Sequence, residues 1–87
     1  MLQYRVALSK KAFNYLTRLS SIDKERIQEK LDLIGLGYFH LCDIKQYEGA
    51  ENTYRLRVGN YRIIYERRDS ELIIQVIKIG PRGDVYK

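Results

Sequence analysis

The sequence predicts an α+β fold, in which an N-terminal strand and a hairpin of two helices precede an antiparallel meander of three or four strands, with the helices packed on one face of the sheet. Three observations lead to this prediction. Apolar residues alternate with arginines on both sides of Gly59-Asn60, residues 72–79 are almost continuously apolar, and residues 10–36 carry apolar side chains at helical spacing. Because 87 residues leave room for one modest core, we expect a single domain over residues 1–87.

The first half of the chain is expected to contain one strand and two helices. The N-terminal residues alternate, which places on one face Leu2, Tyr4, Val6 and Leu8. Ser9 is expected to cap a first helix of about three turns, and Ser21 a second helix over about residues 22–36, which Gly35 and Gly37 end. The side chains expected to face the sheet are Ala12, Phe13, Leu16 and Leu19 in the first helix and Ile22, Ile27, Leu31 and Ile34 in the second.

The second half is expected to supply most of the sheet. Residues 38–52 lack clean periodicity and are interpreted as a long connection. A β-hairpin and a charged turn follow, and the apolar run 72–79 is typical of a central strand covered on both faces. Gly80-Pro81 is expected to end that strand, and the tail 82–87 to pair at a sheet edge or lie across the sheet.

The hairpin around Gly59-Asn60 has a register that can be worked out from the sequence. Gly at the first central position suits a two-residue type II′ turn. The pairs then expected on the core side are Val58 with Tyr61, Leu56 with Ile63, and Tyr54 with Tyr65. The opposite side carries Arg57 directly across from Arg62, with Arg55 two residues along. Like charges opposed across two strands are destabilising, so this cluster is either an anion-binding site or an ordinary solvated face.

Composition narrows the classes of function. The chain has a net charge of +5 and an isoelectric point of about 9.4, which favours a polyanionic partner such as nucleic acid. Residues 55–87 hold eight Lys and Arg against four Asp and Glu, so the excess lies in the C-terminal part. Cys42 is the single cysteine and is expected to be a small core residue; His40 is expected to be a loop residue. No apolar run is long enough for a membrane helix, and we expect a cytoplasmic protein.

The element order and two short motifs resemble the RelE toxins of the RelE/ParE superfamily. The motifs are Gly-Asn-Tyr61-Arg62-Ile-Ile-Tyr65, preceded by Tyr54-Arg55-Leu56-Arg57, and Ile79-Gly80-Pro81-Arg82-Gly83-Asp84-Val85-Tyr86. The resemblance covers essentially the whole chain in length and order, and it assigns the family's site residues, catalytic and RNA-binding, to Arg55, Arg57, Arg62, Arg82 and Tyr86. The two positions before the turn are lysines in the best-known members and arginines here.

The resemblance implies a ribosome-dependent endoribonuclease of a type II toxin-antitoxin system, which cleaves mRNA in the ribosomal A site by attack of a ribose 2′-OH on the adjacent phosphate. It implies as partners a cognate antitoxin, the ribosome with its rRNA, and mRNA. It allows a heterotetramer with the antitoxin, and it implies no cofactor, metal or membrane partner. Since arginine is a poor proton acceptor, we expect cleavage to depend on charge and orientation, to be slower, or to recruit an acid such as Glu66 or a phosphate oxygen.

Two other functions stay open at the level of sequence. A ParE-like toxin would share the scaffold and inhibit DNA gyrase without cleaving anything. A catalytically weak member would only bind its antitoxin or RNA. The joint presence of Arg82 and Tyr86 near the C-terminus favours the endoribonuclease over the gyrase inhibitor.

Overall fold

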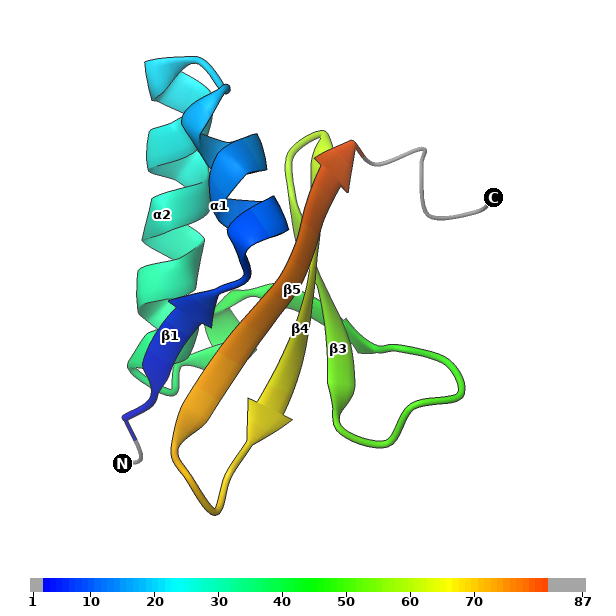
Figure 1. Cartoon of the computed structure of the whole chain (residues 1–87). Helices are drawn as coiled ribbons and strands as arrows, with labels where there is room; N and C mark the ends of the chain where they lie inside the picture. Colours follow the sequence, from blue (N-terminus) through cyan, green and yellow to red (C-terminus); the bar gives the residue numbers. More distant parts are fainter. Residues whose placement is uncertain (1–2, 82–87) are drawn as a thin grey trace.

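A computed structural model describes residues 3–81 (Figure 1). Two helices and a short 3-10 helix accompany five strands in this part of the chain. In chain order the elements are β1 (Arg5–Leu8), α1 (Lys10–Thr17), α2 (Ser21–Gly35), η1 (Phe39–Leu41), β2 (Asp43–Gln46), β3 (Thr53–Val58), β4 (Tyr61–Arg68) and β5 (Ile73–Pro81).

The strands form one mixed sheet in the order β1-β5-β4-β3-β2. Strand β1 pairs with β5 in parallel, and the strands from β2 to β5 form an antiparallel meander. Figure 1 shows α1 and α2 on the same side of the sheet. The α+β class, the helix hairpin on one face and the antiparallel meander are therefore confirmed.

Strand β2 corrects the interpretation of residues 38–52 as a connection. Asp43–Gln46 pairs with β3 at the sheet edge, and the preceding residues 39–41 form η1. The strand is only four residues long, too short for alternation to stand out beside the irregular aromatic residues before it. Ile44 packs against the core while Asp43 and Lys45 are exposed, so the alternation is present.

The helices begin and end close to the predicted positions. Ser9 caps α1 by accepting a hydrogen bond from the Ala12 amide at 3.1 Å, but the helix ends at Thr17, two residues before Leu19. Ser20, and not Ser21, caps α2 by accepting from the Asp23 amide at 3.3 Å.

The C-terminus of α2 forms a Schellman motif. The Gly37 amide donates to the Ile34 carbonyl, the Tyr38 amide donates to the Leu33 carbonyl, and Gly37 has a φ of 85°. The stop predicted at the glycines is confirmed.

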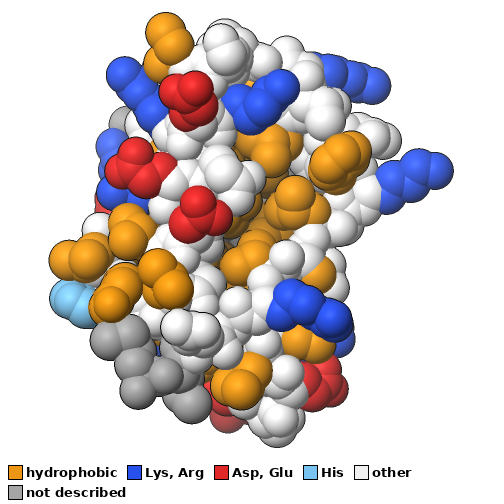
Figure 2. Space-filling view, turned by 90° about the vertical axis from the view of Figure 1, so that its left-hand side faces the viewer, with side chains coloured by type: hydrophobic (Ala, Val, Ile, Leu, Met, Phe, Trp, Pro, Cys, Tyr) orange, Lys and Arg blue, Asp and Glu red, His pale blue; other side chains and the backbone are white. Residues whose placement is uncertain are grey.

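Two apolar side chains predicted to face the sheet do not reach it. Phe13 is 54% exposed and Ile22 is 64% exposed, because they fall outside the stripes that Ala12 with Leu16 and Ile27 with Leu31 and Ile34 define. Five residues separate Ile22 from Ile27, which turns it about 140° away on the helix. The outer face of α2 mixes signs as predicted, and Figure 2 shows acidic and basic side chains interspersed over it.

Strand β5 differs from the predicted central strand in position and cover. It lies between β1 and β4, while β4 occupies the centre of the sheet. Ile64 lies opposite Lys78 and Tyr65 opposite Val76, which leaves Ile77 as the extra residue of a β-bulge. Ile77 is 43% exposed, so β5 is not covered on both faces there. Gly80 and Pro81 belong to the strand and do not end it.

The core fills the space between the helices and one face of the sheet. Its fully buried side chains include Ile27, Leu31 and Ile34 from α2 and Leu56, Ile63, Tyr65, Ile74 and Val76 from the sheet. Cys42 packs against this cluster, as predicted, and burial raises the pKa of its thiol. Within residues 3–81, neither helix is long and apolar enough to cross a membrane.

Arg67 packs against aromatic side chains at the end of the core that is remote from the Gly59-Asn60 turn. Its guanidinium carbon lies 4.2 Å from the ring centre of Phe39 and 5.5 Å from that of Tyr4. Its Nε contacts Asp69 Oδ1 at 2.7 Å, and the Tyr4 hydroxyl donates to the same oxygen at 2.8 Å. These hydrogen bonds, the one from Arg67 first, lower the pKa of Asp69. The cluster joins the residue before β1, η1, β4 and the turn between β4 and β5.

We expect Arg67→Ala to lower the free energy of unfolding by about 1–2 kcal/mol, because it removes two cation–π contacts and the packing of the aliphatic stem. Since the Asp69 pKa is lowered by folding, its contribution is present above the unfolded value of about 3.9 and is lost as the pH falls through the lowered pKa. Urea unfolding at neutral and acidic pH measures both effects. Arg68→Ala is the control, because exposed ion pairs such as those of Arg68 contribute little to stability. An equal loss in the two variants would contradict the assignment.

Candidate functional site

The three arginines of the hairpin lie on the sheet face that points away from the helices. The observed register pairs Val58 with Tyr61, Arg57 with Arg62, Leu56 with Ile63 and Tyr54 with Tyr65, as predicted. Gly59 has a φ of 57° and Asn60 has no positive φ, which is the pattern of a type II′ turn. Because the buried residues of β3 and β4 face the helices, alternation turns the arginines to the other side. We call the surface formed by Arg55, Arg57 and Arg62 the arginine face.

The arginines differ in exposure. Arg57 is exposed and Arg55 is half-buried, whereas Arg62 is only 4% exposed. Arg62 lies on the central strand β4, opposite Gly80 of β5. A face that served only solubility would leave all three guanidinium groups in water. The site therefore combines one fixed and two more accessible guanidinium groups, which suits binding of a planar or tetrahedral anion.

Two lysines extend the arginine face and were not predicted as part of it. Lys45 lies directly across from Arg55 on β2, and Lys78 lies across from Ile64 on β5. Lys45 was not predicted because β2 has only four residues, too few for the alternation of Asp43, Ile44 and Lys45 to identify a strand. Asp43 lies across from Arg57 and is the acidic residue at this edge. The face is thus basic across four strands.

The hairpin end that carries the arginines is tied to the helices through Tyr61. Its hydroxyl donates to Asp23 Oδ2 of α2 at 2.6 Å, and its ring meets that of Tyr15 of α1 edge-on at 6.4 Å between centres. The hydrogen bond to Asp23, followed by burial, raises the pKa of Tyr61. Since Tyr61 is next to Arg62, this contact orients the strand segment that presents the site.

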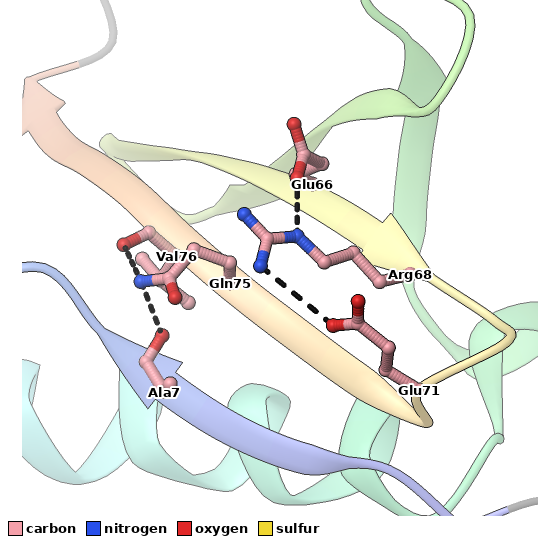
Figure 3. A network of polar contacts seen from close by, with 6 residues as sticks. All are labelled: Ala7, Glu66, Arg68, Glu71, Gln75 and Val76. Atoms are coloured by element: carbon pink, nitrogen blue, oxygen red, sulfur yellow. Dashed lines mark hydrogen bonds and ion pairs between the residues drawn. The ribbon is translucent and has the colours of Figure 1, made fainter.

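Glu66, the acid considered for proton transfer, is engaged by another residue. Figure 3 shows it beside Arg68, whose Nε lies 2.5 Å from Glu66 Oε1, while Glu71 contacts the same guanidinium at 3.8 Å. Gln75 lies opposite Glu66 on β5. Its side-chain nitrogen Nε2 lies 3.4 Å from the carbonyl oxygen of Ala7 and 3.5 Å from that of Val76. Glu66 thus belongs to an ion-pair cluster at the end of β4 remote from Arg62.

The remaining predicted site residues, Arg82 and Tyr86, lie outside the described residues. Between residues 3 and 81, no three His, Cys, Asp or Glu side chains come together in a group that could hold a metal ion. His40 is exposed in η1. Among the described residues, the arginine face is therefore the arrangement best suited to a chemical role, namely stabilisation of a phosphate by several positive charges.

The sequence of residues 6–86 matches the family described as the ParE toxin of the type II toxin-antitoxin system parDE. The chain belongs to the RelE/ParE superfamily of type II toxins. Similar proteins include toxins named RelE. A toxin named RelE1 from Methanocaldococcus jannaschii is 25% identical over 88 residues, which cover 99% of this chain and 98% of the relative.

Solved RelE structures have the same fold. The RelE–RelB complex of Pyrococcus horikoshii contains a chain that superposes with a TM-score of 0.83 at 28% identity, over 97% of this chain and 100% of that one. The RelB–RelE antitoxin–toxin complex of Methanococcus jannaschii gives a TM-score of 0.71 at 26% identity, over 92% and 94%. The chain is thus similar to RelE toxins in both fold and sequence.

Proposed function

We propose that this RelE-type toxin is an endoribonuclease that cleaves mRNA in the ribosomal A site and acts without a metal ion. The observation that carries the proposal is the pairing of Arg57 with a buried Arg62 on an otherwise open basic sheet face. Fixed guanidinium groups at this spacing can bind the scissile phosphate and stabilise the charge that develops on it. The likeness to RelE toxins supports mRNA as the substrate.

The proposed reaction is attack of a ribose 2′-OH on the neighbouring phosphorus. The new bond forms between the 2′-oxygen and phosphorus, the bond to the 5′-oxygen breaks, and the products are a 2′,3′-cyclic phosphate and a 5′-OH. Arg57 and Arg62 would bind the non-bridging oxygens, and Arg55 would hold the adjoining backbone. By their positions in the family motif, Arg82 would add charge or the leaving-group proton and Tyr86 would stack on a base.

Proton transfer is the step that this site supports least. Arginine stays protonated at any physiological pH, and Glu66 is held by Arg68. We therefore propose that charge and substrate orientation supply most of the acceleration, with the ribosome bending the mRNA. A phosphate oxygen can accept the 2′-OH proton in such a site.

The end groups of the RNA products test this chemistry. Purified toxin is added to ribosomes translating a defined mRNA, and the fragments are labelled by polynucleotide kinase with and without prior phosphatase treatment. We expect the downstream fragment to be labelled without phosphatase, because 2′-OH attack leaves a 5′-OH. A downstream fragment that requires phosphatase would carry a 5′-phosphate and would contradict the proposed reaction.

The family assignment also favours one alternative, since the matching family is described as the ParE toxin. A ParE-like toxin would inhibit DNA gyrase and leave mRNA intact. The arginine face favours RNA cleavage over gyrase inhibition. A supercoiling assay with purified gyrase distinguishes the two functions.

We further propose that a cognate antitoxin binds this toxin. Two toxins and two antitoxins can then form a heterotetramer. Relatives of this chain were solved as RelE–RelB complexes. The helix side also exposes large apolar side chains, which favour a protein partner; they include Phe13, Ile22, Leu36 and Leu41. Figure 2 shows hydrophobic side chains gathered in a hollow of this side.

The antitoxin is expected to place acidic residues against the arginine face. Arg55→Glu combined with Arg57→Glu should weaken the complex at least tenfold, because two attractive contacts become repulsive. Titration calorimetry with the purified cognate antitoxin measures the change, with Arg5→Glu on the edge strand β1 as the control. Unchanged affinity in the double variant would show that the antitoxin leaves this face open.

A further inference from the structure

A basic cleft lies around the corner from the arginine face, between α1 and the last residues of β5. Its volume is about 450 Å³, and its lining includes Lys11 and Asn14 of α1, the C-cap residue Arg18, and Lys78 and Gly80 of β5. Three cations thus come together from two elements that are distant in sequence. None of the lining residues within the described range 3–81 is acidic.

The topology of the sheet creates this cleft. Strand β1 ends at Leu8, opposite Val76, so β5 continues past it and α1 lies alongside in its place. Ser9 fixes the start of α1 there, because its hydroxyl donates to the Ile77 carbonyl at 2.8 Å while capping the helix. Lys11, Asn14 and Arg18 follow at spacings of three and four residues, which put them on one helix face.

The cleft is continuous with the arginine face. Gly80 lines the cleft and is also the residue opposite Arg62 on β4. Lys78 lines the cleft and lies across from Ile64, one strand away from Arg55. A flexible chain with regularly spaced negative charges could therefore contact both surfaces without leaving the protein.

We propose that this cleft binds backbone phosphates of the same single-stranded RNA whose scissile segment lies on the arginine face, an inference that rests on the proposed function. The ammonium groups of Lys11 and Lys78 and the guanidinium group of Arg18 bind phosphates. The Asn14 amide donates hydrogen bonds to sugar or phosphate oxygens. The continuity through Gly80 favours one RNA strand over an acidic peptide or a separate ribosomal RNA segment. The cleft then extends the RNA site by several nucleotides beyond the cleaved bond.

The experiment compares RNA lengths with the whole toxin. Fluorescence anisotropy measures binding of 2′-O-methyl RNA, which 2′-OH attack cannot cleave, in single strands of about four and about twelve nucleotides. The variant Lys11→Gln with Arg18→Gln changes two exposed side chains, and its matched control is Lys24→Gln with Arg26→Gln on α2. We expect the cleft variant to bind the longer RNA about tenfold more weakly, to bind the shorter RNA normally, and to lower the salt slope by about 1.4, or about 0.7 per phosphate contact.

The inference is overturned if the cleft variant binds the longer RNA as well as the control does, or if wild-type toxin gains nothing from the longer RNA. It is also overturned if the variant keeps its RNA affinity but loses affinity for the antitoxin or for ribosomes without mRNA, since the cleft would then serve that partner. Cleavage by wild-type toxin on translating ribosomes is measured in parallel. Its absence would defeat the proposed function, independently of the binding result at the cleft.

Discussion

Arg62→Ala is expected to reduce the rate of mRNA cleavage by about 10²–10³-fold, because it removes a fixed charge that stabilises the transition state. Arg62 is 4% exposed and lies on the central strand, so its guanidinium needs little reorganisation when substrate binds. Arg62→Lys keeps a charge but loses the planar fork, and we expect an intermediate rate. Single-turnover cleavage on stalled ribosomes measures each rate, and thermal unfolding shows whether each variant is folded.

Arg68→Ala is the matched control for this prediction. It removes an arginine from the same strand and the same face, but at the end where Arg68 contacts Glu66 and Glu71. Its cleavage rate should stay within about twofold of wild type, because surface ion pairs of this kind contribute little. If Arg68→Ala and folded Arg62→Ala lose activity equally, the site depends on total charge and not on the position of Arg62.

Ile63→Ala is expected to have the largest effect on stability, about 2–5 kcal/mol, because it opens a cavity at a fully buried position. Ile63 is 0% exposed and pairs with Leu56 and Ile79 on the core side. Ile64 offers the same substitution one residue further along, on the opposite and less buried face. Ile64→Ala should lower the free energy of unfolding by less than half as much, because Ile64 lies outside the core and its truncation leaves no large buried cavity. Urea unfolding of the two variants measures both values.

The comparison also tests the orientation of β4. If Ile64→Ala destabilises the protein as much as Ile63→Ala, the arginine face is covered in solution by something that buries it. If Ile64→Ala is the milder change and cleavage falls, Ile64 contributes to the RNA surface between Arg55 and Lys78. Either result bears directly on how the arginines are presented.

The hairpin was the most predictable part of the molecule. Its register followed from alternation and from Gly59, because a two-residue turn fixes every cross-strand pair. The sequence could not show that Arg62 is buried and Arg57 exposed, since both occupy equivalent positions in the alternating pattern. That difference depends on which neighbouring strand lies beside each residue, and therefore on the order of strands.

The other departures also arise from tertiary context. Strand β2 is held by pairing with β3 and not by its own four residues, so local pattern alone could not identify it. The bulge at Ile77 exposes an apolar residue within residues 72–79, which the sequence predicts to be buried on both faces. The basic cleft beside α1 depends on β1 ending before β5, which no local feature records.

The position of the cut in mRNA tests the central claim most directly. Primer extension on mRNA from a reconstituted translation reaction, with purified toxin added, maps the cleavage sites to single nucleotides. We expect cuts within the codon in the A site, only when ribosomes are present, and we expect these cuts to be lost in Arg62→Ala. Intact mRNA under these conditions, together with inhibition of supercoiling by DNA gyrase, would contradict it.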